Sequence, residues 1–233
     1  DLSEEERISR MYEINGEYLE DERSNLNVQL PGPILVIGDL GLWYGRRMGY
    51  KEIPSGNICD CLYAGRDDLY ISVNISTKDF YYMDVYETIT SLVETYKIIP
   101  STLKLEITET AIMTGTAGEL EMIERFRKSG FQVEIDDFGS GYSSFNTLKD
   151  MDVDVLKIDM GFLRTTRPER IERSMSIINT IISLTKTLGL SVITEGVETK
   201  EQIDKLTQMG CGIYQGYYFS KPIPVGQFED TYL

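Results

Sequence analysis

Residues Phe131-Gln-Val-Glu-Ile-Asp-Asp137 form a strand-like run in which apolar and polar side chains alternate, and which ends in two adjacent acids. Because a strand has a period of two residues, Val133 and Ile135 share one face while Glu134 and Asp136 share the other. Three more strand-like runs end in carboxylate, amide or amine groups: Ile71–Ser76, Leu103–Glu109 and Val155–Asp159. The polar faces of such strands meet in one interior, where acids repel one another unless a hard cation neutralises them. The pattern therefore predicts a site for a divalent metal ion.

Strand-like and helix-like runs alternate along the chain from Tyr70 onward, which is typical of an α/β protein with a parallel sheet. Gly130, Gly189 and Gly210 each follow a helix-like run and precede the next strand, where a helix end is expected. Polar residues gather at the carboxyl ends of the strands, which favours a barrel over a doubly wound sheet. The expected helices cover residues 77–98, 117–129, 168–189 and 199–210, and the further strands cover Ile34–Leu40, Ser191–Glu195 and Gly212–Phe219.

The charge balance and the lack of histidine exclude several classes of partner and of catalytic group. The chain has 233 residues, with 38 acids, 23 bases, no histidine and a formal net charge of −15. This charge disfavours nucleic-acid polymers and anionic membranes as the main partners. Without histidine, His-based triads and His-ligated zinc are excluded, and acid–base work falls to carboxylates, Lys, Tyr or water on a metal. Mg²⁺ or Mn²⁺ fits such oxygen-rich ligands best.

The length fits one large domain, which we place at residues 31–233 after a charged helix or linker over residues 1–30. No apolar run approaches the roughly 20 residues of a membrane span, and no signal peptide is visible. We therefore expect a cytoplasmic protein that makes no membrane contact. Cys59, Cys61 and Cys211 are odd in number and lack zinc-knuckle or redox spacing, so they are expected to be reduced and structural.

Six short motifs lie at or near the strand ends. They are Val73-Asn-Ile-Ser76, Leu105-Glu-Ile-Thr-Glu109, Asp136-Asp-Phe-Gly-Ser-Gly-Tyr-Ser-Ser144, Leu156-Lys-Ile-Asp159, Glu195-Gly-Val-Glu-Thr199 and Gln215-Gly-Tyr-Tyr-Phe-Ser-Lys-Pro222. In this order they closely resemble the EAL-domain family, the cyclic di-GMP phosphodiesterases, over roughly Tyr70 to Pro224. The resemblance implies a modified TIM barrel with one antiparallel strand, two Mg²⁺ or Mn²⁺ ions, and opening of cyclic di-GMP to linear pGpG.

The same resemblance implies roles for single residues. The implied metal ligands are Asn74, Glu106, Asp136, Asp137 and Glu195. Lys157 would hold the attacking water and offset charge on the phosphorane, and Gln215 would help to position that water. Glu195 would complete the catalytic site, and Glu109 would brace the loop that follows Asp137. Substrate contacts are expected from Gln215, Glu198 and Arg46.

The chain departs from the family pattern in its first βα unit. The Glu-Ala-Leu that names the family, with the Arg that follows it, is absent, and residues 41–69 lack the long amphipathic helix expected next. The unit is therefore expected to be rebuilt or truncated. Asp39 is the preferred substitute for the missing glutamate, because it ends an apolar strand and precedes Arg46. Glu17 is the alternative, since it lies nearer the expected sequence distance from Asn74, although no strand precedes it.

Two classes of function follow from this sequence. The first, which we favour, is a metal-dependent phosphodiesterase, because the ligand set is nearly intact and a pure scaffold has no chemical reason to keep Lys157. The second is a degenerate EAL domain that binds cyclic di-GMP or a protein partner without hydrolysis, as a signalling or regulatory module. The expected partners are cyclic di-GMP, a second copy of the chain, and a fused or separate sensory or GGDEF domain.

Overall fold

The computed structural model describes seven segments of the chain. They are residues 34–39, for which the backbone alone is described, and residues 69–76, 79–80, 84–114, 117–140, 152–164 and 167–221. The helix or linker predicted over residues 1–30, together with Glu17, lies outside these segments. Arg46 and the connection over residues 40–68 also lie outside them.

One parallel sheet of seven strands forms the centre of the described fold, and its strands lie side by side in chain order. They are β1 (Ile34–Asp39), β2 (Leu69–Ile75), β3 (Leu103–Thr108), β4 (Gln132–Phe138), β5 (Val155–Ile158), β6 (Ser191–Thr194) and β7 (Ile213–Tyr214). The helices are α5 (Val85–Tyr96), α6 (Glu109–Thr114), α7 (Ala117–Lys128), α9 (Pro168–Leu188) and α10 (Lys200–Met209), with 3-10 turns η1 (Pro100–Thr102) and η2 (Met160–Phe162).

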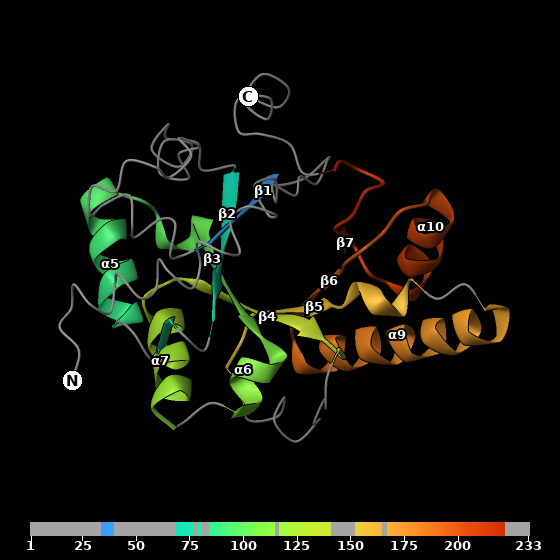
Figure 1. Cartoon of the computed structure of the whole chain (residues 1–233), viewed down its shortest axis with the longest axis horizontal. Coiled ribbons are helices and arrows are strands. Elements are labelled where there is room, and N and C mark those ends of the chain that lie inside the picture. Colours follow the sequence, from blue (N-terminus) through green and yellow to red (C-terminus); the bar gives the residue numbers. More distant parts are fainter. Residues whose placement is uncertain are drawn as a thin grey trace, which may run out of the picture.

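The sheet curls as part of a barrel, and the helices lie around its outer side (Figure 1). None of the strand pairs in the described segments is antiparallel, and none joins β7 to β1. The α/β fold of the barrel type is thus confirmed, while the antiparallel strand that the resemblance implies is not among these seven. No helix in the described part of the chain is both long and apolar enough to cross a bilayer.

The helix ends follow the local chemistry of the sequence. Helix α10 begins with a capping box, in which the Thr199 side chain accepts from the Gln202 amide and the Gln202 side chain accepts from the Thr199 amide. Helices α9 and α10 end at Gly189 and Gly210, whose φ angles of 74° and 90° suit glycine. Two elements differ from the sequence prediction: α6 was not expected, and β7 covers only two residues of the predicted strand Gly212–Phe219. Just after β7, Gly216 lies against the Val197 backbone, where a Cβ would come within 2.2 Å of the carbonyl oxygen.

The two faces of the sheet differ in polarity. On β2, β3 and β4 the apolar set faces the helices and is fully buried: Ile71, Val73, Ile75, Leu103, Leu105, Ile107, Val133 and Ile135. The alternate residues face the interior of the curl, where Asn74 of β2 pairs in register with Glu106 of β3, and Glu106 pairs with Glu134 of β4. The alternation read from the sequence therefore places the polar residues of neighbouring strands at one interior.

Candidate metal centre

Three carboxylates meet at the carboxyl ends of β4 and β6. Oxygen atoms of Asp136, Asp137 and Glu195 all lie within 4.8 Å of one another, which suits a shared cation. Adjacent residues of a regular strand would point to opposite faces. Here the register of β4 shifts between Ile135 and Phe138, and Asp137 takes a left-handed φ of 55°. This irregularity brings two neighbouring acids to one side, at a local conformational cost of about 1–3 kcal/mol.

Lys157 links this group to a fourth carboxylate. Its ammonium nitrogen lies 2.9 Å from Asp136 Oδ1, 2.9 Å from Glu195 Oε1 and 3.0 Å from Glu106 Oε1. Lys157 lies on β5, while Glu106 lies on β3 and Asp136 on β4. One ammonium therefore binds carboxylates from different strands of the curled sheet. The side chain of Lys157 is 1% exposed, so water screens these ion pairs little.

Burial and crowding shift the protonation of the cluster. Burial, together with neighbouring acids, raises the pKa of Glu106 and of Glu195 to about 7, although Lys157 opposes the rise. Burial also raises the pKa of Asp137, and the charge of Asp136 adds to that effect. Burial lowers the pKa of Lys157, but Glu106, Glu195 and Asp136 outweigh it and hold that pKa well above its usual value. Carboxylates that resist ionisation in this way favour a cation that can neutralise them.

Asn74 and Asp39 occupy matching positions on neighbouring strands. Asn74 is half-buried near the end of β2, in register with Glu106 on one side and with Asp39 on the other. The backbone of Asp39 therefore lies at the same edge of the sheet as the cluster, at the end of β1. Its role as a ligand stays a prediction, as does that of Asn74.

Glu109 lies just outside the cluster and contacts the segment that follows it. Its Oε2 accepts a hydrogen bond of 3.0 Å from the Gly139 amide, two residues after Asp137. Glu109 is buried, and its Oε1 has no hydrogen-bond partner within the described segments. This bond lies where the family resemblance implies a brace for the loop after Asp137, and the bracing role of Glu109 stays a prediction.

Gln215 and Glu198 lie near Glu195 but differ in exposure. Gln215 is buried, its Oε1 has no hydrogen-bond partner among the described residues, and its backbone bonds to Thr194 and Val197. This buried amide can accept a hydrogen bond from a small molecule. Glu198 is exposed, and its backbone amide donates to Gln202 Oε1.

Sequence reasoning gave no role to a second buried ion pair. Lys104 Nζ lies 3.0 Å from Glu134 Oε1, and Glu134 is fully buried. The alternation of apolar and polar residues in β4 predicts that Glu134 faces the interior, and this was the one hint in the sequence of a buried acid at that position. Its partner Lys104 lies on the neighbouring strand β3, and the sequence of one strand does not show which residue of another strand it contacts.

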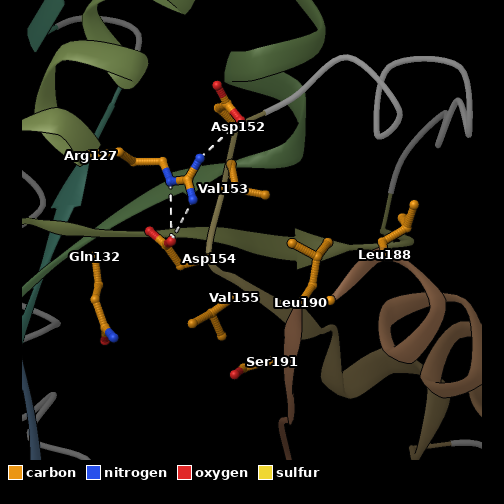
Figure 2. A pocket seen from close by; sticks show the side chains of 10 residues that line it. Arg127, Gln132, Asp152, Val153, Asp154, Val155, Leu188, Leu190 and Ser191 are labelled. Atoms are coloured by element: carbon orange, nitrogen blue, oxygen red, sulfur yellow. Dashed lines mark hydrogen bonds and ion pairs between the residues drawn. The ribbon is translucent and has the colours of Figure 1, made fainter.

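An open pocket of about 420 Å³ lies at the opposite edge of the sheet, near the amino ends of β5 and β6 (Figure 2). Its charged groups are already paired, because Arg127 binds Asp152 and Asp154, and Asp154 also accepts from the Val133 amide. These contacts join α7 to the start of β5, so the charged residues of the pocket have a structural role and need no ligand to account for them. The pocket is therefore a weaker candidate site than the cluster around Lys157.

Comparison with known proteins matches this geometry. The family model described as the EAL domain matches residues 57–222. The cyclic di-GMP phosphodiesterase RocR of Pseudomonas aeruginosa is 37% identical over 144 residues, which cover 62% of this chain and 36% of RocR. The bifunctional diguanylate cyclase/cyclic di-GMP phosphodiesterase MucR of the same species is 34% identical over 70% of this chain and 24% of MucR. The chain thus matches less than half the length of either relative.

Solved structures agree with the sequence matches. The EAL domain of Mycobacterium smegmatis DcpA superposes with a TM-score of 0.70 at 25% identity, over 90% of this chain and 96% of that one. The PaMucR phosphodiesterase in complex with c-di-GMP gives a TM-score of 0.70 at 28% identity, over 94% and 84% of the two chains. Because the family model covers most of the chain and the fold agrees, this protein belongs to the EAL domain family.

Proposed function

We propose that this chain is a metal-dependent phosphodiesterase that hydrolyses cyclic di-GMP to linear pGpG. The observation that carries the proposal is a group of four carboxylates at one edge of the sheet, in which Glu106 and Glu195 are buried, Asp136 and Asp137 are half-buried, and three of the four bind Lys157. Relatives named as cyclic di-GMP phosphodiesterases support the choice of substrate. A surplus of buried negative charge suits a cation-assisted reaction on an anionic phosphodiester.

The carboxylates would hold the metal ions, which we take to be two Mg²⁺ or Mn²⁺. Asp136, Asp137 and Glu195 would provide the closest ligand atoms, and Glu106, Asn74 and Asp39 would complete the set. When bound, such ions supply Lewis-acid activation of the phosphodiester and of a water molecule. Manganese and calcium occur with cyclic di-GMP in structures of Klebsiella pneumoniae BlrP1, which supports oxygen-loving cations here.

The remaining residues would orient the reactants. Lys157 keeps its positive charge, so it can offset negative charge that develops on the phosphorus oxygens. Its three N–H donors now face three carboxylates, so it would hold an attacking water once one of those carboxylates turns to a bound cation. The amide oxygen of Gln215, which has no partner among the described residues, can accept from the same water. Glu109 would fix the turn after Asp137 through Gly139. Glu198 and Arg46 would contact the substrate at the rim.

A second candidate function is binding of cyclic di-GMP without hydrolysis, as a regulatory module. The absence of the Glu-Ala-Leu motif and of its arginine favours it. Asp39 is shorter than glutamate by one methylene, and a misplacement of about 1 Å can cost a hundredfold in rate. Both candidates use the same group of carboxylates and differ only in turnover.

One experiment separates the two functions. The chain is incubated with cyclic di-GMP and Mn²⁺, the products are separated by chromatography, and binding is measured by calorimetry in Ca²⁺. The phosphodiesterase predicts pGpG from the wild type and from Asp152→Asn, a matched control at the opposite edge, and almost none from Asp136→Asn. Binding without product would support the regulatory module. Failure to bind and to turn over would contradict both functions.

The partner proteins and the cellular location of the chain are also proposals. We propose a homodimer, a fused or separate sensory or GGDEF domain, and a place in the cytoplasm. The bifunctional name of MucR supports a GGDEF-type neighbour, because that relative is named as a cyclase as well. Sedimentation of the purified chain tests the dimer, and a monomer at working concentration would contradict it.

A further inference from the structure

A second ion pair lies in the interior of the curled sheet, nearer the amino ends of the strands than the candidate metal centre. Lys104 Nζ on β3 lies 3.0 Å from Glu134 Oε1 on β4. Glu134 is fully buried and Lys104 is 13% exposed, so the pair is almost closed off from water. Lys104 also lies over the ring of Tyr70, 5.3 Å from its centroid. None of the six family-like motifs contains either member of this pair.

The register of the sheet places Glu134 directly beside the group that holds Lys157. Glu134 pairs with Glu106 across β3 and β4, and Asp136 follows it by two residues on the same face of β4. Both Glu106 and Asp136 bind the Lys157 ammonium. Lys104 approaches from the other side, because it pairs in register with Gln132, two residues before Glu134. Glu134 therefore stands between two lysines and is bound by one of them.

A fully buried carboxylate needs a counter-charge, because desolvation of a lone ion is costly. Within the described segments, Lys104 is the cation bound to Glu134, and Glu134 Oε2 has no hydrogen-bond partner there. If Lys104 lost its charge, the other buried ammonium that the structure describes on this side of the sheet would be that of Lys157. Glu134 would then compete with the carboxylates that now hold Lys157.

We propose that Lys104 is a positioning residue for Lys157. By binding Glu134, it prevents that carboxylate from drawing the Lys157 ammonium away from Glu106, Asp136 and Glu195. The consequence for turnover rests on the proposed phosphodiesterase function. The placement of Lys157 does not depend on that function, and it can be measured without substrate.

Nitrogen-15 NMR of lysine ammonium groups in the whole chain tests this placement directly. A buried, ion-paired ammonium exchanges protons slowly with water and gives a visible signal, which its loss in Lys157→Met assigns. In Lys104→Met the Lys157 signal should move or broaden. In the double variant Lys104→Met/Glu134→Gln it should return to its original position, because the competing charge is gone. Glu134→Gln alone should leave it unchanged.

This asymmetry between the two single variants distinguishes positioning from general destabilisation. An unchanged Lys157 signal in folded Lys104→Met would overturn the proposal, and so would a double variant that fails to restore it. A shift in Glu134→Gln as large as that in Lys104→Met would also overturn it. If Lys104→Met does not fold, Lys104→Gln, which can still donate to Glu134 but carries no charge, takes its place with the same expected shift.

The rate of cyclic di-GMP turnover provides a second test of the role of Lys104. With Mn²⁺ and cyclic di-GMP, kcat should fall about tenfold to a hundredfold in Lys104→Met, as expected for a misplacement of about 1 Å. It should recover in the double variant, and an unchanged kcat in Lys104→Met would count against the proposal. A wild type that turns over no substrate would contradict the proposed function alone, since the ammonium signals still report where Lys157 lies.

Discussion

Lys157→Met removes the positive charge at the centre of the cluster while keeping most of the apolar stem. The buried carboxylates of Glu106 and Glu195 and the half-buried carboxylate of Asp136 would lose the ammonium that now lies 2.9–3.0 Å from each. Removing one partner of a buried ion pair costs about 3–5 kcal/mol, because the remaining charge stays uncompensated. For a domain of this size that loss lowers Tm by about 6–20 °C.

The cost should depend on pH in a defined direction. The pKa of Glu106 and of Glu195 lies near 7 in the folded protein, against 4.5 for the free side chain. At pH 5 these carboxyls can hold protons, so loss of the lysine leaves little uncompensated charge. At pH 8 they are largely ionised in the wild type, where Lys157 lowers both pKa values, so loss of the lysine then forces them either to stay charged without a partner or to take up protons, and the cost is larger. The destabilisation by Lys157→Met should therefore be several-fold larger at pH 8 than at pH 5.

Urea unfolding with EDTA, at both pH values, measures this difference. The matched control is Lys128→Met, because Lys128 also binds a glutamate, Glu124, but on an exposed helix surface. It should change the free energy of unfolding far less, since water screens exposed pairs. Added Mn²⁺ should restore more stability to Lys157→Met than to the wild type. A loss below about 1 kcal/mol at pH 8, or an equal loss at pH 5, would refute the reasoning.

Three further predictions concern the metal and the turn beside it. Because Glu106 and Glu195 hold protons below about pH 7, cation binding must release them, so the rise in Tm with Mn²⁺ should grow from pH 6 to pH 8; a rise that is independent of pH would contradict this. Glu109→Ala should speed hydrogen exchange at the Gly139 amide, and unchanged protection would show that the bond of 3.0 Å contributes little. Asp39→Asn should weaken Mn²⁺ binding measured by calorimetry, while Asp39→Glu should preserve or raise activity; equal Mn²⁺ affinity in Asp39→Asn would remove Asp39 from the ligand set.

The sequence predicted the sheet well because alternation is a local property. The runs on β3 and β4 show period two directly, and the structure buries Leu105, Ile107 and Val133 as that period requires. Helix ends at Gly189 and Gly210 were readable for the same reason, since each depends on one residue with a positive φ. Helix α6 was missed because its six residues are too few to show a helical period.

The site was harder to predict because it depends on contacts between strands. Strict alternation would send Asp136 and Asp137 to opposite faces, and nothing in the run announces the register shift and the left-handed Asp137 that bring them together. The three partners of Lys157 lie on β3, on β4 and just after β6, so their meeting depends on register. Lys104 and Glu134 pair diagonally, 30 residues apart along the chain, which a reading of single runs cannot reveal.

Charge balance connects the two ion pairs with the metal proposal. The interior acids that the structure describes around the two lysines are Glu106, Glu134, Asp136, Asp137 and Glu195. When all are ionised, Lys104 and Lys157 leave a surplus of three negative charges. Two divalent cations would exceed this surplus by one, which attracts an anionic phosphodiester. An ionised Asp39 at the same edge would bring the interior to neutrality before substrate binds. With Asp39 at the metal as proposed, Asp39→Asn should weaken the binding of the metal while it strengthens the attraction of the loaded site for its anionic ligand.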